Sequence, residues 1–304
     1  MNKQRVADNI VQAIVKEVNH SSTKEYEGGC KTLVIDAMNL AYRFYYGMPR
    51  LTTSDGNVSS VVYGFLLKIN SLYNMFQPEN LIICWDSKSN IRKAIDSTYK
   101  VREKEENAEL EAYRDQIKSL KDIFPMIGIP SIEVPDYESD DIMAILARRE
   151  DLKPLVLCTN DSDLYQCLNP GTNMYNDTEL ITEAFLLDKH GLTPRQYTIY
   201  KSIVGCTTDN VKGIKGYGKV AAKKIINNCG GQIGAIYHHI ASLGPVYEEF
   251  INSLLLIVLP YNMGYSLPID PIPQLNLNSK VIDFLARYEI NVIDPNKFLG
   301  GING

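Results

Sequence analysis

Four short apolar runs, each followed by acidic residues, constrain the fold of this chain more than any other feature. The runs occupy residues 32–36, 81–86, 129–134 and 154–158. A continuous apolar run is typical of a strand that is buried on both faces, as in a parallel sheet. Helix-like segments separate the runs, which indicates alternating strands and helices. We therefore expect an α/β fold with a doubly wound, mostly parallel sheet.

Acidic residues gather where these predicted strands end, namely Asp36, Asp86, the cluster Glu138, Asp140 and Asp141, and the pair Asp161 and Asp163. The carboxyl ends of parallel strands meet at one edge of a sheet, so we expect these side chains to converge on one cleft. Any one of them alone is a common cap or turn residue. Their recurrence favours a metal site, because gathered carboxylates repel one another without a cation. Oxygen ligands favour Mg²⁺ or Mn²⁺, and two such ions are the usual apparatus for phosphodiester displacement.

Basic residues are concentrated in two segments, although the net charge of the 304 residues is -5. The first segment, residues 88–104, includes Arg92, Lys93, Lys100 and Arg102, with Tyr99 among them. A solvated helix face is one interpretation. The other is a phosphate clamp in which the tyrosine stacks on a base, and the neighbouring acids favour it.

The second basic segment, here called the glycine-lysine loop, spans residues 209–219. Its glycines, which allow tight turns, are Gly213, Gly216 and Gly218, and its lysines are Lys212, Lys215 and Lys219. Backbone N–H groups at the start of the next helix, together with lysine charge, can bind nucleic-acid phosphates. A plain turn between helices is the alternative. A dinucleotide site is disfavoured because no strand precedes the glycines.

The cysteines and the N-terminal segment indicate the setting of the protein. The 6 cysteines form no CxxC pair, which predicts reduced thiols in a cytosolic compartment. Residues 6–18 repeat apolar side chains every fourth position with charges between them, which predicts an amphipathic helix rather than a signal peptide. We expect a cytoplasmic protein, in the host cytoplasm if a phage encodes it, without a membrane partner.

Six short motifs occur in a specific order along the chain. They are Val34-Ile-Asp36-Ala-Met-Asn39, Trp85-Asp86, Tyr99-Lys100-x-Arg102, Tyr137-Glu-Ser-Asp-Asp141, Thr159-Asn-Asp161-Ser-Asp163, and Gly205-x-x-x-Asp209-Asn210-Val-x-Gly213-Ile-x-Gly216-Tyr-Gly218. This set resembles the 5′ nuclease (flap endonuclease) family. It is most similar to the bacteriophage 5′-3′ exonucleases and the phage RNase H-type primer-removal nuclease, and the likeness covers about residues 31–230.

The resemblance implies a PIN-like α/β nuclease core at residues 31–193, with an arch over the active site at about residues 88–124. It implies a helical C-terminal DNA-binding region at residues 194–304. Within that region, a helix-three-turn-helix motif at about residues 205–226 would grip duplex DNA around a K⁺ ion held by backbone carbonyls. Residues 1–30, an amphipathic helix and its linker, lie outside the motifs.

The resemblance also implies a role for each matching residue. Asp36, Asp86, Glu138 and Asp140 would hold the first metal ion, Asp161, Asp163 and Asp209 the second, and Asp141 would lie close to both. Asp136 has no such role and is expected to be a solvated loop residue. Lys100 and Arg102 would engage the scissile phosphate, Arg43 a further phosphate, and Tyr99 a base.

One residue departs from the family pattern. Cys206 stands where the family usually has an aspartate, and a neutral thiol is a poor magnesium ligand, so we expect a weaker second ion. The favoured function is a divalent-metal-dependent 5′-3′ exonuclease and structure-specific 5′ flap endonuclease that leaves 5′-phosphates. The expected substrates are DNA with 5′ flaps or 5′ ends and RNA-DNA hybrids. We expect the protein to be a monomer that acts in replication and has other replication proteins as partners.

Two alternatives stay open. The first is a structure-specific DNA-binding protein whose cleavage is weakened by Cys206. The second is a PIN-type ribonuclease, against which the duplex-binding motif argues.

Overall fold

The structure is a computed structural model that describes residues 3–16, 29–101, 107–261, 267, 272, 275–277 and 279–300. Most of the predicted linker that follows the N-terminal helix lies outside these residues, as does Arg102.

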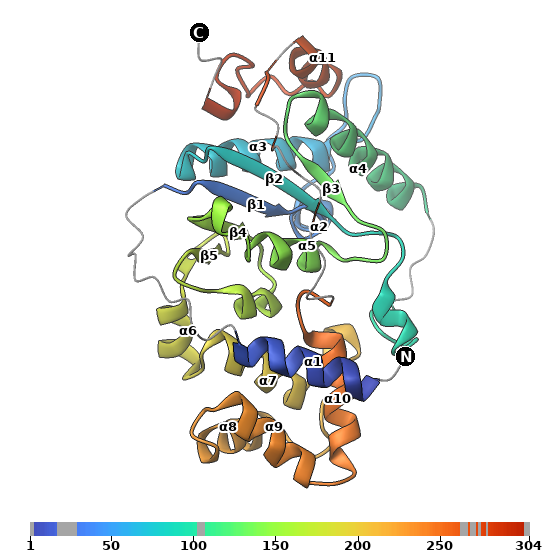
Figure 1. Ribbon diagram of the computed structural model, residues 1–304. Helices are drawn as coiled ribbons and strands as arrows, with labels where there is room; N and C mark the ends of the chain where they lie inside the picture. Colours follow the sequence, from blue (N-terminus) through green and yellow to red (C-terminus); the bar gives the residue numbers. More distant parts are fainter. Residues whose placement is uncertain are drawn as a thin grey trace.

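A six-stranded sheet forms the centre of the molecule (Figure 1). Its strands are β1 (Thr32–Asp36), β2 (Asn80–Trp85), β3 (Ser131–Glu133), β4 (Leu155–Cys158), β5 (Thr172–Tyr175) and β6 (Leu180–Ile181). Their order is β3-β2-β1-β4-β5-β6, and every neighbouring pair is parallel except β5 and β6. The predicted doubly wound, mostly parallel sheet is confirmed. The apolar pattern did not indicate β5, which begins with the polar residues Thr172 and Asn173, or β6, which has only two residues.

Successive residues of the central strands pack into different cores. In β1, Val34 joins one hydrophobic cluster, while Leu33 and Ile35 join the other. β4 repeats this division with Leu157 on the first side and Val156 on the second. The sheet is therefore buried on both faces, which explains why its strands are continuous apolar runs.

Helices cover both faces of the sheet (Figure 1). One face packs against α2 (Ala37–Gly47), α3 (Ser60–Phe76), α4 (Ala108–Met126) and α11 (Ser279–Arg287). The other packs against α5 (Ser139–Leu146) and is extended by α1 (Lys3–Lys16), α6 (Glu183–His190), α7 (Pro194–Val204), α8 (Lys219–Asn228), α9 (Ile233–Ser242) and α10 (Val246–Ile257). Short 3-10 helices lie at Ile91–Ala94, Glu150–Leu152, Ser162–Cys167, Thr207–Asp209 and Phe298–Gly300.

The amphipathic helix predicted at the N-terminus is α1, which packs against α9 and α10. Its apolar side buries Ala7, Ile10 and Val11. Its polar side is tied down as well, because the hydroxyl of Tyr237 donates to Asp8 Oδ1 at 2.5 Å. This helix is thus built into the helical part of the molecule. Of the helices that the structure describes, none has the length and apolar character needed to cross a bilayer.

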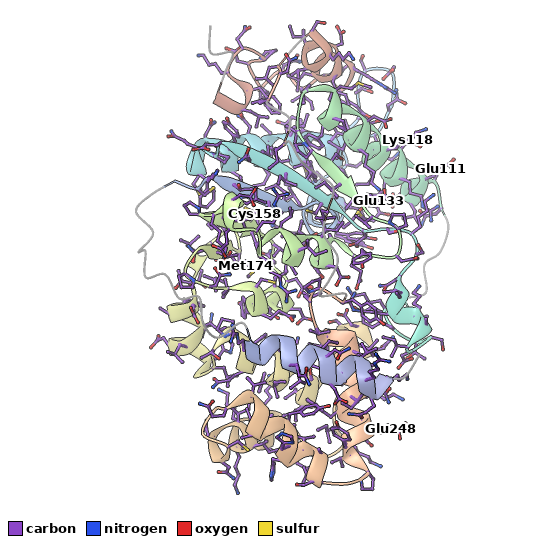
Figure 2. The ribbon with its side chains drawn as sticks, viewed as in Figure 1. Glu111, Lys118, Glu133, Cys158, Met174 and Glu248 are labelled. Carbon is purple, nitrogen blue, oxygen red and sulfur yellow. The ribbon has the colours of Figure 1, made fainter. Side chains whose placement is uncertain are left out.

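The helix α4 is rich in charged residues, and its charges point outward. Figure 2 shows Glu111 and Lys118 at the outer side of this helix, with Glu133 nearby on β3. Cys158 and Met174 lie instead in the interior, and both are buried. All six cysteines are free thiols.

Candidate active site

Acidic side chains from different parts of the chain meet at the carboxyl end of the sheet, between β1 and β4, where the strand order reverses. Asp36 ends β1 and caps α2 by accepting the N–H of Asn39 at 3.1 Å. Its other oxygen accepts the hydroxyl of Thr159, just beyond β4, at 2.8 Å. Ser139 connects two of the acids, because its N–H donates to Asp86 at 2.8 Å and its hydroxyl to Asp36 at 3.2 Å. The structure therefore brings together acids that sequence reasoning expected to converge.

Burial and mutual repulsion raise the pKa values of these carboxyl groups. Burial first, and then the charge of Asp86, raise the pKa of Asp36 to about 7. Burial likewise raises the pKa of Asp140 well above its ordinary value, and the charges of Asp161 and Asp36 add to the effect. The charge of Asp161 also raises the pKa of Asp163 after burial has done so. Asp161 is therefore electrostatically linked to both groups of acids.

Four of these acids have no cationic partner in the part of the chain that the structure describes: Asp36, Asp86, Asp140 and Asp161 form no ion pair there. Asp36 and Asp140 are buried, while Asp86 and Asp161 are half-buried. A buried carboxylate without a paired cation is costly, so it either holds a proton or requires an added cation. Carboxylate oxygens are the preferred ligands of Mg²⁺ and Mn²⁺. The donor set therefore fits a hard divalent metal ion, which the residues named here would hold.

Asp141, predicted to lie close to both metal ions, is bound on both oxygens by groups of the protein. It is fully buried, and Arg92 donates to its two oxygens at 2.6 and 2.8 Å. The N–H groups of Glu138 and Tyr261 donate to the same oxygens at 3.3 and 2.7 Å. Each oxygen thus already accepts two hydrogen bonds, which leaves no lone pair for an ion.

Arg92 corrects a prediction, because it was expected to bind DNA. Its side chain is 0% exposed. Besides Asp141, it donates to Glu138 and to two backbone carbonyls, that of Leu256 in the last turn of α10 and that of Val258 directly after the helix. A DNA phosphate cannot reach a guanidinium in that position. Lys93, the next residue, is exposed.

Tyr99 and Lys100 contact the carboxylate of Glu138. The hydroxyl of Tyr99 donates to Oε2 at 3.0 Å, and its ring is only 3% exposed, so in this structure it offers no face to a base. Lys100 donates to Oε1 at 2.5 Å. Burial would raise the pKa of Glu138, but the charges of Lys100 and Arg92 outweigh it and lower that pKa. Glu138 thus positions a lysine beside the acids, and it keeps fewer lone pairs for a metal ion than the sequence prediction supposed.

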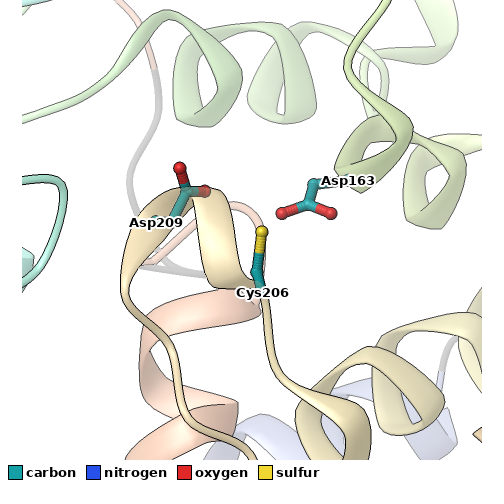
Figure 3. Close-up of side chains that lie close together, drawn as sticks. All are labelled: Asp163, Cys206 and Asp209. Carbon is teal, nitrogen blue, oxygen red and sulfur yellow. The ribbon is translucent and has the colours of Figure 1, made fainter.

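A second acidic group joins the sheet to the helical region. Ligand atoms of Asp163, Cys206 and Asp209 lie within 4.8 Å of one another, and in Figure 3 the thiol points toward the space between the two carboxylates. Lys201, on α7, pairs with Asp163 at 2.6 Å. Cys206 therefore occupies a ligand position between two acids that were expected to bind the second ion.

The glycine-lysine loop owes its shape to two glycines. Gly205 and Gly213 have φ values of 82° and 67°. A Cβ atom on Gly213 would lie 2.5 Å from the carbonyl oxygen of Ile203, and one on Gly205 would lie 2.4 Å from that of Val211. The close approach of these segments fixes the loop, and sequence reasoning had noticed Gly213 but not the role of Gly205. A Cβ atom on Gly216 or Gly218 would contact nothing within 4 Å, so close packing does not require glycine at either position.

The remaining predicted nucleic-acid contacts differ in their surroundings. Lys212, Lys215 and Lys219 are exposed on the glycine-lysine loop. Arg43 is exposed in part, but its guanidinium pairs with Asp177, which also pairs with Lys68 at 2.9 Å. Arg102 lies outside the described residues, and so does the middle of the predicted arch, which stays a prediction.

Three residues near the acids were given no role in the sequence prediction, and they differ in whether the sequence contains a signal for them. Lys201 gave no local signal, because its pairing with Asp163 depends on the packing of α7 against the segment after β4. Tyr113, on α4, is buried with its hydroxyl unpaired among the described residues, and the charge of Asp86 adds to the rise that burial causes in its pKa. Thr159 had a usable signal, since it directly follows an apolar run.

Residues 31–204 match the family model described as the 5′-3′ exonuclease, N-terminal resolvase-like domain. A 5′-3′ exonuclease of Aquifex aeolicus is 30% identical over 205 residues, which are 66% of this chain and 70% of that protein. The thermostable DNA polymerase I of Thermus thermophilus is 30% identical over 234 residues, which are 75% of this chain but only 27% of the polymerase. The chain thus spans about a quarter of the length of that relative.

Solved structures share the fold. The T5 5′-exonuclease with bound zinc has a TM-score of 0.63 at 21% identity, covering 75% of this chain and 89% of the other. A bacteriophage T5 flap endonuclease variant in complex with DNA and metal ions has a TM-score of 0.63 at 18% identity, covering 88% and 96%. Flap endonuclease-1 from Methanococcus jannaschii has a TM-score of 0.56 at 18% identity, covering 94% and 95%. These likenesses confirm the predicted PIN-like fold.

Proposed function

The chain belongs to the 5′-3′ exonuclease family, and from this premise we propose that it is a divalent-metal-dependent 5′ nuclease that cuts DNA at 5′ ends and 5′ flaps. One observation carries the proposal. Asp36 and Asp140 are buried at the edge of the sheet and form no ion pair among the described residues, and the charge of Lys100 acts on Asp140. The glycine-lysine loop carries exposed lysines. The backbone N–H of Lys100 donates to the carbonyl of Asp209 at 3.1 Å, which joins the two features.

The first ion would be held by Asp36, Asp86 and Asp140, with Glu138 at its margin. The second would be held by Asp161, Asp163 and Asp209. When bound, Mg²⁺ or Mn²⁺ would polarise the scissile phosphate and lower the pKa of the attacking water. The resident groups of the chain supply positioning and charge around that chemistry.

Lys100 is the group of the chain best placed to stabilise negative charge on the phosphate. Burial would lower the pKa of its ammonium, but the charge of Glu138 outweighs burial and holds that pKa well above its ordinary value. The lysine therefore stays charged at neutral pH. Its side chain is 26% exposed, so one side of it remains open to a substrate. Fixed positive charge at this point favours a phosphoryl transition state.

The glycine-lysine loop would bind duplex DNA through phosphate contacts of Lys212, Lys215 and Lys219 and through backbone N–H groups. A K⁺ ion held by backbone carbonyls is part of this proposal. So is the division into a nuclease core at residues 31–193 with its arch and a DNA-binding region at residues 194–304. We further propose action on RNA-DNA hybrids, a monomeric state, replication proteins as partners, and a cytoplasmic location.

A second candidate function is structure-specific DNA binding with weak cleavage. The position of Cys206 between Asp163 and Asp209 favours it, because a neutral thiol replaces an anionic ligand in that group.

A time course on a 5′-flap duplex with Mg²⁺ or Mn²⁺ separates the two functions. We expect the chain to cut the flap, Cys206→Asp to cut faster, and Asp36→Ala to cut at least 100-fold more slowly, a loss of about 3 kcal/mol of transition-state stabilisation. If neither the parent chain nor Cys206→Asp cuts a flap that both bind, the nuclease proposal fails and the binding function replaces it. Equal rates for Asp36→Ala and the parent would overturn the metal assignment.

A further inference from the structure

A cavity of about 430 Å³ lies between α1, the glycine-lysine loop and α10. It is apart from the acids described above, and the family match at residues 31–204 does not include α1. The volume is within the range of small-ligand sites. Its floor is partly apolar, with Ile95, Val211 and Leu256 among the residues that line it. The cavity is therefore large enough for a phosphate group together with part of a sugar.

Three lysines from two distant parts of the chain border this cavity: Lys3 comes from α1, and Lys212 and Lys215 come from the glycine-lysine loop. Lys3 donates to Asn252 Oδ1 at 2.9 Å and, at the longer distance of 3.5 Å, to the carbonyl of Ile95, which leaves one N–H donor on its ammonium. Within the described residues, the ammonium groups of Lys212 and Lys215 form no ion pair. The lining of the cavity thus presents ammonium groups with N–H donors that no other group of the described residues occupies.

The two acids at the cavity are already engaged. Asp96 accepts the N–H and the hydroxyl of Thr98 at 2.8 and 2.7 Å. These bonds lower the pKa of Asp96, and the charges of Lys212 and Lys3 lower it further. Glu249 accepts the backbone N–H of Lys215 at 2.8 Å. Neither acid neutralises a lysine ammonium by a direct ion pair, so an incoming anion does not have to displace one.

Ser253 provides an independent indication of a ligand. Its side chain lines the cavity and is 3% exposed, and among the described residues its hydroxyl has no hydrogen-bond partner. A buried hydroxyl left unpaired is unfavourable, and native proteins seldom contain one without a water or ligand partner. A phosphate oxygen would accept this hydroxyl as well as the lysine N–H groups.

The position of Lys3 is fixed by the packing of its helix. Ala7, Ile10 and Val11 are buried against the helical region. Gln4 donates to Asp8 at 2.8 Å, and Tyr237 binds the same carboxylate. Because α1 is anchored on both its apolar and its polar sides, Lys3 stays beside the loop at little further cost in conformational freedom.

We propose that this cavity binds a phosphate group and that α1 thereby forms part of the nucleic-acid interface. The phosphate belongs either to the backbone of a bound duplex or to a free nucleotide. The duplex form of this inference rests on the proposed function, since it needs DNA held at the glycine-lysine loop.

The first arm of the test measures duplex binding by fluorescence anisotropy with Ca²⁺ in place of Mg²⁺, over a range of salt concentrations. Each phosphate contact contributes about 0.9 to the slope of log Kd against log salt concentration. We expect Lys3→Gln to reduce that slope by about 1 and to weaken binding 3- to 10-fold at fixed salt, in the manner of a lost phosphate contact. Arg5→Gln is the matched control, an exposed cation on the same helix that does not line the cavity. It should leave the slope unchanged, and Lys3→Arg should restore it.

The second arm measures the shift in Tm caused by inorganic phosphate and by deoxyadenosine monophosphate. If Lys3→Gln and Ser253→Ala lose that shift while the duplex slope is unchanged, the ligand is a free nucleotide phosphate. A loss of slope identifies the duplex backbone. If Lys3→Gln alters neither the slope nor the shift, the proposal is overturned. A parent chain that binds duplex but never cuts it would refute the nuclease function and still allow the cavity to be tested.

Discussion

At the scale of single residues, the acids of the site fall into two classes with different purposes. Glu138, Asp141 and Asp163 are paired with Lys100, Arg92 and Lys201 and so organise the site. Asp36 and Asp140 have raised pKa values and form no ion pair within the described chain. A bound cation would offset the unfavourable burial of charge at Asp36 and Asp140. In the metal-free protein, these two carboxylates should therefore lower the free energy of unfolding.

Asp36→Asn should therefore stabilise the metal-free protein at high pH. The pKa of Asp36 is about 7 in the folded chain against an ordinary 3.8, so between these values the folded state holds more protons than the unfolded state. The protonated Asp36 is tolerated in the folded chain at low pH, and the folded state becomes progressively less stable as the pH rises from about 4 to about 7. At 1.4 kcal/mol per pKa unit the full effect is at most about 4 kcal/mol, and lost hydrogen bonds will reduce it.

Thermal unfolding in EDTA at pH 5 and pH 8 measures this effect. The gain in Tm for Asp36→Asn should be larger at pH 8. The control is Asp136→Asn, an exposed acid outside the cluster, which should change Tm equally little at both pH values. An Asp36→Asn variant that loses stability most at pH 8 would contradict the account.

Arg92→Met should destabilise the protein severely. The change leaves Asp141 as a fully buried carboxylate without its cation, and breaking such a pair costs about 3 to 5 kcal/mol. Lys93→Met is a close control, because the neighbouring lysine is exposed and should cost less than about 0.5 kcal/mol. Urea unfolding of both variants gives the comparison, and equal losses would show that Arg92 has no special role.

At the scale of elements, prediction from sequence succeeded where one strand or helix carries the signal. The runs that became β1, β2 and β4 are apolar because both faces of the sheet are buried, and α1 shows its amphipathic spacing. The two-residue strand β6 has too little sequence to show a period. The basic segment misled for another reason: a run of Lys and Arg does not reveal that one member, Arg92, turns inward to a buried acid. Such pairings depend on tertiary packing.

The glycine-lysine loop offers a prediction at this scale. Gly213→Ala should distort the loop, because its Cβ would meet the backbone of Ile203 and Val204 at 2.5 Å, in addition to the strain of a positive φ. We expect a loss of about 3 kcal/mol or more. Gly216→Ala has a similar positive φ but open space, so it isolates backbone strain at about 1 kcal/mol. Tm and duplex affinity should both fall much further for Gly213→Ala, and similar losses in the two variants would refute the packing argument.

At the scale of the whole molecule, the site depends on contacts between the sheet and the helical region. Arg92 binds Asp141 of α5 together with carbonyl groups at the end of α10. The side chain of Asn210 donates to the carbonyl of Thr98 at 3.0 Å, so the glycine-lysine loop is also joined to the basic segment. The second acidic group has the same character, because Asp163 follows β4 while Cys206 and Asp209 follow α7.

An ion held by that second group would therefore fasten the two halves of the molecule to each other, and Cys206→Asp should strengthen the effect. A carboxylate binds Mg²⁺ better than a neutral thiol, and a tenfold gain in affinity adds about 1.4 kcal/mol to the stability at saturating metal. For a chain of this size that corresponds to a rise in Tm of about 2 to 4 °C. Cys206→Ser removes the thiol without adding a charge, so its Mg²⁺-dependent shift should match that of the parent. Tm measured across a Mg²⁺ titration would contradict the prediction if the serine and aspartate variants gained equally, since the gain would then come from loss of the thiol rather than from a new ligand.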